Sequence, residues 1–513
     1  MIISLALSFI AIASGALLTY TYEEDAPLVS RLCSGACIGF GALGLVGFVL
    51  ASFLGLTPVA LGLTALVLAT PFLLLTNQRC RNYLDEDCNR ALQAISRASS
   101  RPDRWAFIYF FFYAGVMIAM WLVFSRALLE KPDGIYTGVL NNYGDLPFHL
   151  SVITRFAFGQ NFPPEDPTFA GVRFTYPFIT DFISAMFVRA GASLRDSMFI
   201  ENYVIGVALV GVLHRFGQQL LRNGTAAILT PVLVILNGGF GWAMLFSDVN
   251  KSDGGVFQVL RHIPHSYTIL PEVASGWRWG NAVTSLLVTQ RGFLLGIPLA
   301  VIVFTQWWAA MKGEKGKGEG GKGKGSRAKQ SPISQPDHSP LTLFPLSRSA
   351  KRMLAAGAVA GLLPLVHAHS FIVVMGMAGC IALINLRKWR EWLAFFVVAI
   401  LIAGPQLLWS THGSAVSTRA FIGWQFGWDN TNENFFWFWF KNTGLFIPLL
   451  IGALLWKQKD YLVSRKLLFF YLPFTLCFIV PNVMKLAPWI WDNVKVLFYW
   501  WIASAPIVAL VLA

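Results

Sequence analysis

Residues 144–149 bring a carboxylate and a histidine into a polar stretch that lies between apolar segments. Their sequence is GDLPFH, so Asp145 and His149 are four residues apart. This spacing places both side chains on one face of a helix. A carboxylate can take the proton of a hydroxyl group within hydrogen-bond reach, which makes Asp145 the candidate general base and His149 a candidate substrate-binding residue. The structural alternative, compatible with the first, is that Asp145 caps a helix that begins near Pro147.

Two acidic residues and a tyrosine follow in the same stretch and are further candidates for substrate binding. Glu165 and Asp166 stand between prolines in Pro163–Pro167, and Tyr176 precedes Pro177. Acidic residues beside prolines are equally typical of ordinary turns, so both interpretations of Glu165 and Asp166 stay open.

Two arginines further along the chain could hold an anionic group. Arg278 lies between two tryptophans, and Arg291 stands at the start of an apolar segment. Arginine binds phosphate through paired N–H donors, so both are candidates for holding a lipid phosphate. The alternative is an interfacial arginine that reaches out to the lipid head groups, with the tryptophans in the aromatic belt of a membrane protein.

Ionisable residues also occur inside or beside apolar segments nearer the C-terminus. His367 and His369 interrupt a long apolar stretch, and Asp492 and Lys495 stand three residues apart where the last apolar segment begins. Ionisable residues within a membrane are costly and are therefore functional candidates. The alternatives are a helix turn for the histidines and an interfacial anchor for the charged pair. A metal would need additional ligands, and the sequence offers only distant carboxylates, so a divalent cation is left open as a cofactor.

Hydrophobic helices must position these residues. Of the 513 residues, 55% are hydrophobic and 13% are charged, about half the charged share of a soluble domain. Apolar runs of about 15 to 25 residues recur along the chain, each about long enough to cross a bilayer. The composition excludes a soluble enzyme and predicts an all-α, polytopic transmembrane protein with about 11–13 spans. The expected spans are 2–20, 33–55, 57–76, 106–127, 197–213, 225–246, 291–310, 353–366, 369–386, 392–409, 437–456, 467–481 and 497–513.

The distribution of the basic residues predicts the orientation. The net charge is +14, and the basic residues gather in short loops, chiefly at 79–104 and 312–352, which should be cytoplasmic. Such loops do not form the basic surface of a nucleic-acid-binding protein. With the N-terminus outside, the polar loops 128–176, 247–290, 410–436 and 482–494 are all extracytoplasmic. A crossing by 178–192 would invert the later loops, so this segment is predicted to be interfacial or re-entrant.

The chain divides at its composition changes. Residues 1–104 hold the first transmembrane helices and an Arg-rich cytoplasmic loop, and 105–311 form a membrane core whose outer loop 128–176 carries the candidate base. Residues 312–350 are rich in Gly, Ser and Lys and are predicted to be a flexible cytoplasmic linker, and 351–513 form a C-terminal transmembrane half.

The outer loop resembles the first extracytoplasmic loop of the GT-C superfamily of polytopic membrane glycosyltransferases, which includes protein O-mannosyltransferases and aminoarabinose transferases. The resemblance is carried by GDLPFH at 144–149, Phe158-Gly159, Pro163-Pro164 and Tyr176-Pro177. In that superfamily an Asp near the start of this loop is the general base, and juxtamembrane helices follow it; the matching position here is Asp145. This chain departs from familiar members in having a single Asp, where many have an acidic pair, and about four spans before the loop. The later motifs look similar to those of uncharacterised bacterial members.

The resemblance implies a transferase that uses a polyprenyl-phosphate sugar and acts with inversion on the extracytoplasmic face. Its partners would be the lipid-linked donor, the bilayer and an acceptor with a hydroxyl group, and no nucleic acid. A bacterial inner membrane is implied, with the endoplasmic reticulum as the alternative. A transporter or flippase of a lipid-linked or anionic solute is the second hypothesis, because the same intramembrane charges could line a translocation path.

Overall fold

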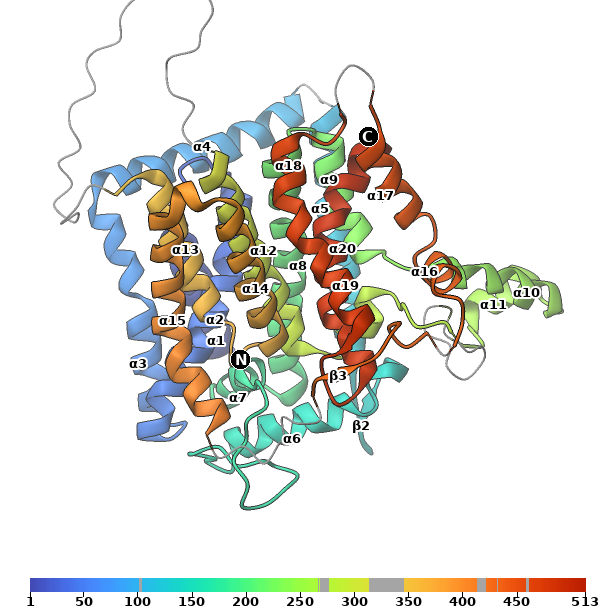
Figure 1. Cartoon of the computed structure of the whole chain (residues 1–513). Helices are drawn as coiled ribbons and strands as arrows, with labels where there is room; N and C mark the ends of the chain where they lie inside the picture. The colour runs from blue at the N-terminus through green and yellow to red at the C-terminus, as the bar shows by residue number, and fades with distance from the viewer. Residues whose placement is uncertain are drawn as a thin grey trace, which may run out of the picture.

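The computed structural model describes residues 1–100, 104–265, 267, 276–312, 346–412, 421–430, 432–457 and 461–513. It is an all-α bundle, as predicted, with only two small two-stranded sheets among these residues (Figure 1). Most of the predicted linker, residues 313–345, lies outside the described residues.

The N-terminal part supplies four long helices and one helix that lies across the end of the bundle. The four are α1 (Ile2–Thr19), α2 (Leu28–Leu54), α3 (Pro58–Leu68) continued by the 3-10 helix η1 (Thr70–Thr76), and α5 (Arg104–Ala127). The amphipathic α4 (Gln78–Ser100) crosses the upper end of the bundle in Figure 1.

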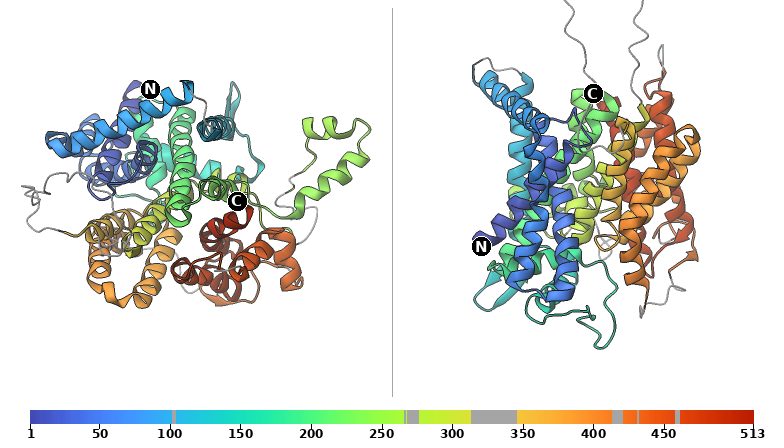
Figure 2. Two further views of the ribbon diagram at one scale, coloured as in Figure 1. Left: turned by 90° about the horizontal axis from the view of Figure 1, so that it is seen from above. Right: turned by 90° about the vertical axis from the view of Figure 1, so that its left-hand side faces the viewer.

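The middle part contains the candidate outer loop and the central helices. Its elements are β1 (Leu128–Lys131), β2 (Gly134–Thr137), η2 (Leu140–Asn142), α6 (Asp145–Ala157), α7 (Ile179–Arg189), α8 (Leu194–Leu221), α9 (Gly224–Ile235), η3 (Phe240–Ala243), α10 (Met244–Lys251), α11 (Gly255–Arg261), the π-helical turn η4 (Val283–Leu287) and α12 (Arg291–Lys312). Figure 1 and the left view of Figure 2 show α10 and α11 projecting sideways from the bundle.

The C-terminal part adds a second group of helices against α12. They are α13 (Arg348–Gly361), α14 (Ala368–Ile384), η5 (Leu386–Lys388), α15 (Trp389–Thr411), α16 (Phe435–Thr443), α17 (Phe446–Leu455), α18 (Arg465–Tyr471), η7 (Leu472–Thr475), α19 (Leu476–Val483), η8 (Ile490–Asn493) and α20 (Val494–Leu512). The short strands β3 (Gly423–Trp424) and β4 (Met484–Lys485) pair antiparallel.

Nine helices of the described chain are long and apolar enough to cross a membrane, or up to 11 if two bent helix pairs each count as one span. The protein is therefore an integral, multi-pass membrane protein. One bent pair falls in the predicted span 225–246, which breaks after Ile235 at the Gly238-Gly239 pair and turns by 72°. The helix α7 has 11 residues, a length of about 16 Å, which is too short to cross. It is buried at the lower end of the bundle, which agrees with the prediction that 178–192 does not cross the membrane.

Basic and polar loops lie at opposite ends of the bundle. The upper end in Figure 1 carries α4 and the C-terminus. Two ion pairs link its elements: Arg31 of α2 pairs with Asp87 of α4 at 2.8 Å, and Arg215 of α8 pairs with Glu23 at 2.7 Å. We call this the basic end. The lower end carries α6 and α7, and we call it the site end. The predicted orientation, with basic loops on one side of the membrane and polar loops on the other, requires this separation.

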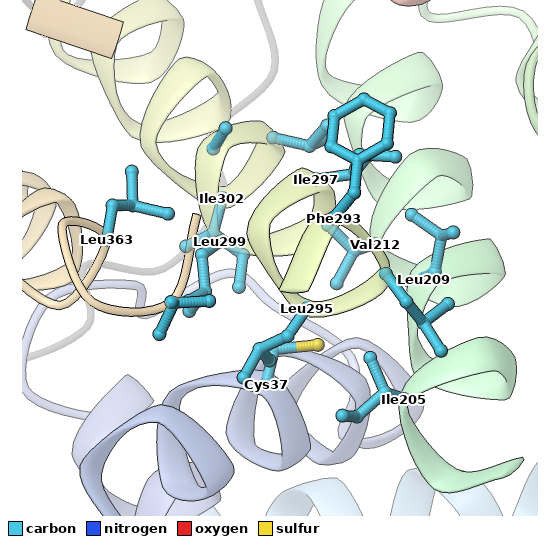
Figure 3. Close-up of a cluster of buried hydrophobic side chains, with 14 of the residues drawn as sticks. Cys37, Ile205, Leu209, Val212, Phe293, Leu295, Ile297, Leu299, Ile302 and Leu363 are labelled. Atoms are coloured by element: carbon cyan, nitrogen blue, oxygen red, sulfur yellow. The ribbon is translucent and has the colours of Figure 1, made fainter. Parts of the chain in front are cut away.

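Between the two ends the core is apolar and centres on α12. Figure 3 shows Leu295, Leu299 and Ile302 of α12 in a buried apolar cluster that includes Cys37 of α2 and Leu209 of α8. These side chains are almost completely buried. A helix that faces lipid leaves one side exposed, whereas α12 is buried on all sides and is therefore the central helix of the bundle. Its first residue, Arg291, lies at the site end.

The close packing of α1 on α2 depends on glycine and gives a testable prediction. A Cβ at Gly39 would collide with the backbone carbonyl of Ala11, whereas a Cβ at Gly62 of α3 meets nothing within 4 Å. Small residues let membrane helices approach closely. Gly39→Ala should therefore lower the free energy of unfolding by about 1–3 kcal/mol. Gly62→Ala, the matched control, should be neutral or slightly stabilising because alanine favours a helix. Equal unfolding midpoints of the two variants in detergent would contradict the prediction.

Candidate functional site

The helix α6 presents Asp145 at the site end. Its apolar face, which includes Leu146, Ile153 and Phe156, is buried against the bundle, so the helix lies along the protein with a fixed rotation. Gly144 occupies the N-cap position, and the Asp145 side chain forms no cap hydrogen bond. The predicted capping role of Asp145 is therefore wrong. Its carboxylate instead accepts a hydrogen bond from Nε2 of Gln290 at 3.3 Å.

The electrostatic surroundings of Asp145 suit a proton acceptor. Burial raises the pKa of Asp145 above its ordinary value, and the neighbouring His149, Lys495 and Gln290 oppose that shift without cancelling it. A carboxylate with a raised pKa is a stronger base once it is deprotonated. Carboxylates whose pKa is shifted by burial are common at functional sites.

Charged and aromatic residues from distant parts of the chain meet Asp145. Lys495 of α20 and Asp492 of η8 form an ion pair of 3.0 Å, and both lie within electrostatic reach of Asp145. Tyr176 is a further electrostatic neighbour of Asp145, and its ring packs on Phe148 with centroids 5.1 Å apart. Residues from both predicted halves thus converge on the candidate base.

The two histidines of the 367–369 turn have different surroundings. His367 is buried at the N-cap of α14, where its Nδ1 lies 2.7 Å from the hydroxyl of Ser370. This is the helix-turn role that the sequence left open. His369 is only partly buried and lies within electrostatic reach of Lys495 and Asp492. Both histidines lie within electrostatic reach of Lys495, but only His369 has an exposed part.

Arg291 lies in a buried ion cluster rather than at an open surface. Its guanidinium is 1% exposed and lies 2.6 Å from a carboxylate oxygen of Asp181 and 2.6 Å from one of Glu201. The same group donates to the hydroxyl of Ser184 at 2.6 Å. We call Arg291, Asp181, Glu201, Ser184 and His149 the buried ion cluster. In this arrangement the guanidinium donors of Arg291 face protein groups, which leaves little of the group for a phosphate.

His149 connects the buried ion cluster to α6. Its Nδ1 lies 2.8 Å from the second carboxylate oxygen of Asp181, and its Nε2 lies 3.2 Å from the backbone carbonyl of Thr289. Both ring nitrogens therefore contact protein atoms. His149 stands one helical turn after Asp145 on α6, and Gln290, which donates to Asp145, directly precedes Arg291. The buried ion cluster therefore fixes both α6 and Gln290 beside the candidate base.

The remaining predicted residues have contacts that lead away from Asp145. Arg278 forms an ion pair of 2.8 Å with Asp429, and its backbone N–H donates to Asn442. Glu165 is held through its backbone by Asn161, and an oxygen of Asp166 accepts the backbone N–H of Thr168, as in an ordinary turn. Across the described part of the chain, no three His, Cys, Asp or Glu side chains gather as a metal site would need.

Sequence reasoning missed Asp181 and Glu201, which complete the cluster, and assigned no role to Gln290. A signal for the two acids was present, since Asp181 is the one carboxylate of α7 and Glu201 lies in α8, a helix long and apolar enough to cross a membrane. Such a residue is expected to find a partner within the protein.

Comparisons with protein-family models, with curated proteins and with solved structures gave no match. The family assignment therefore stays a prediction that rests on the motifs of the outer loop.

Proposed function

We propose that the protein is a membrane glycosyltransferase that moves a sugar from a polyprenyl-phosphate donor to an acceptor hydroxyl at the extracytoplasmic face. The observation that carries the proposal is that Asp145, a carboxylate of raised pKa, lies within electrostatic reach of a buried cation, Lys495, at one end of the bundle. A base and an anion-stabilising group are the two parts that transfer from a phosphate leaving group requires.

In the proposed reaction Asp145 takes the proton of the acceptor hydroxyl while its oxygen attacks the anomeric carbon. The bond between that carbon and the donor phosphate oxygen breaks, and the phosphate leaves on the opposite side with the electron pair, so the configuration inverts. Lys495, with His369 beside it, stabilises the charge that develops on the phosphate, an effect that is usually the largest single contribution to catalysis. Tyr176 is proposed to contact the sugar or the acceptor.

The buried ion cluster is assigned a positioning role in this proposal. Arg291 and His149 hold α6 and Gln290 in place, and they do not bind the phosphate. Arg278 pairs with Asp429, and Glu165 and Asp166 shape the outer loop, so none of the three takes part in the chemistry.

A transporter or flippase is the alternative. It would need polar groups along a path between the two ends. Between the site end and the basic end, however, the middle of α12 packs mainly on apolar side chains, some of which Figure 3 shows. Charged groups gathered at an end, with apolar packing beyond them, favour a transferase.

The test is sugar transfer in sealed vesicles of known orientation that contain the full chain. A panel of labelled polyprenyl-phosphate sugars is added to the extracytoplasmic or the cytoplasmic face, and labelled product is measured. We expect product only with donor on the extracytoplasmic face, and none with a nucleotide sugar. Labelled donor that appears in the opposite leaflet without any product would overturn the proposal in favour of the flippase.

A further inference from the structure

A cavity of about 590 Å³ opens at the basic end, on the opposite side of the bundle from Asp145. It lies where α12 ends, α13 begins and η5 leads into α15, with the turn between α1 and α2 as its fourth wall. Its volume falls within the range of small-molecule sites. The charged side chains that line it are Lys312, Arg348, Lys351, Arg352, Lys388, Glu24, Asp25 and Glu391. We call it the basic cavity.

The charges of the basic cavity do not cancel. Arg352 pairs with Asp25 at 2.8 Å, and Arg348 pairs with Glu24 at 2.9 Å, which uses two of the three acids. Lys312, Lys351 and Lys388 then stand against Glu391 alone, an excess of two positive charges. Lys351 has no ion-pair partner among the residues that the structure describes.

Two of the lysines also have a structural role, which leaves part of their donor capacity unused. The ammonium groups of Lys312 and Lys388 donate to the backbone carbonyls of Gln219 and Ala310, near the C-terminal ends of α8 and α12. Cations are favoured at helix C-termini. An ammonium has three N–H donors, so each lysine can donate to a helix end and to a bound anion at the same time.

The position of the basic cavity indicates the class of ligand. Lys312 ends α12, one of the helices long enough to span a membrane, so the cavity lies at the depth of the lipid head groups. Basic pockets between transmembrane helices at the cytoplasmic side attract anionic lipids. The neighbouring segment 313–345, which joins two walls of the cavity, carries six Lys or Arg and only three Asp or Glu, so its own charge disfavours it as the occupant.

We propose that the basic cavity is a binding site for a phosphate-bearing anion, with an anionic phospholipid head group as the ligand that its depth favours. The proposal is independent of the proposed transferase activity, because it concerns the opposite end of the bundle.

The experiment measures binding to the purified full chain in neutral detergent, by native mass spectrometry and by thermal stabilisation. The probes are short-chain phosphatidylglycerol, short-chain phosphatidylcholine and inorganic pyrophosphate. Lys351→Gln/Lys388→Gln removes two of the three cavity lysines and with them the whole excess of positive charge. Arg97→Gln/Lys457→Gln is the matched control, because it removes two exposed cations outside the cavity. The single variant Lys351→Gln keeps the contact of Lys388 with the end of α12, so it tests the charge of the cavity without disturbing that contact.

We expect phosphatidylglycerol, and not phosphatidylcholine, to bind the wild-type chain. The Lys351→Gln/Lys388→Gln chain should need at least about tenfold more lipid for half-saturation, the Lys351→Gln chain should lie between, and the control should match wild type. If pyrophosphate binds, the double variant weakens that binding, and phosphatidylglycerol does not bind, then the basic cavity is a site for a soluble phosphate. Equal binding by the double variant and wild type, or an equal loss in the control, would overturn the proposal.

Discussion

Replacing Asp145 by Asn should abolish sugar transfer while leaving the fold intact. Loss of a general base typically costs a factor of about 10²–10⁴ in rate. Asn keeps the shape of Asp and can still accept a hydrogen bond from Gln290. Burial raises the pKa of Asp145 in the folded protein, so the ionised carboxylate lowers stability at neutral pH. The neutral Asn removes that cost, and the variant should unfold at the same temperature as wild type or a higher one.

The measurement combines transfer from the donor that the wild-type chain uses with thermal unfolding in detergent. Asp133→Asn is the matched control, since Asp133 is exposed in the turn between β1 and β2 and accepts a hydrogen bond from Tyr136. It should keep full activity. Transfer that survives Asp145→Asn would remove Asp145 as the base, and a loss of activity together with unfolding would mean that the residue is structural.

The same pKa shift fixes the direction of the pH dependence. Asp145 acts only as a carboxylate, so transfer should rise with pH through its pKa. Because burial raises that pKa, the rise should come at higher pH than for an exposed aspartate. The contribution of Asp145 to stability has the opposite sign, since it is fully present below the ordinary pKa of an aspartate and is lost as pH rises through the raised pKa.

The architecture could be predicted because it depends on composition and on the distribution of basic loops. Runs such as 2–20 and 497–513 match α1 and α20 closely, since a span is defined by its length and apolarity alone. The break of span 225–246 at Gly238-Gly239 was harder to place, because those residues favour a turn only when the surrounding helices leave room for it. Their flexibility is visible in the sequence, and the 72° turn is not.

The candidate site could be predicted only in part. Asp145, Lys495 and Asp492 were named from residue type and position, and the structure brings them together. Whether Arg291 can bind a phosphate depends on which side chains contact its guanidinium. These are Asp181 and Glu201, which lie 110 and 90 residues away in the chain. Spacing within one segment cannot reveal such pairs, because they are created by the packing of α7 and α8 on α12.

Replacing Arg291 by Met should destabilise the fold more than any other change considered. The substitution leaves the carboxylates of Asp181 and Glu201, both 0% exposed, without their shared cation. Removing one partner of a buried ion pair typically costs about 3–5 kcal/mol, because the remaining charge is buried without compensation. Arg90→Met is the control, since the Arg90–Glu86 pair is more than half exposed and such pairs contribute about 0–1 kcal/mol.

A second substitution separates lost charge compensation from lost packing. In Arg291→Met/Glu201→Gln one of the two stranded charges is gone, so the double variant should unfold at a higher denaturant concentration than Arg291→Met alone. Groups that share one network show such coupling, whereas independent sites give additive losses. The free energy of unfolding is measured by denaturant titration in mixed micelles. If Arg291→Met is no less stable than Arg90→Met and yet loses transfer, then the guanidinium binds the donor and the buried ion cluster is not what holds α6.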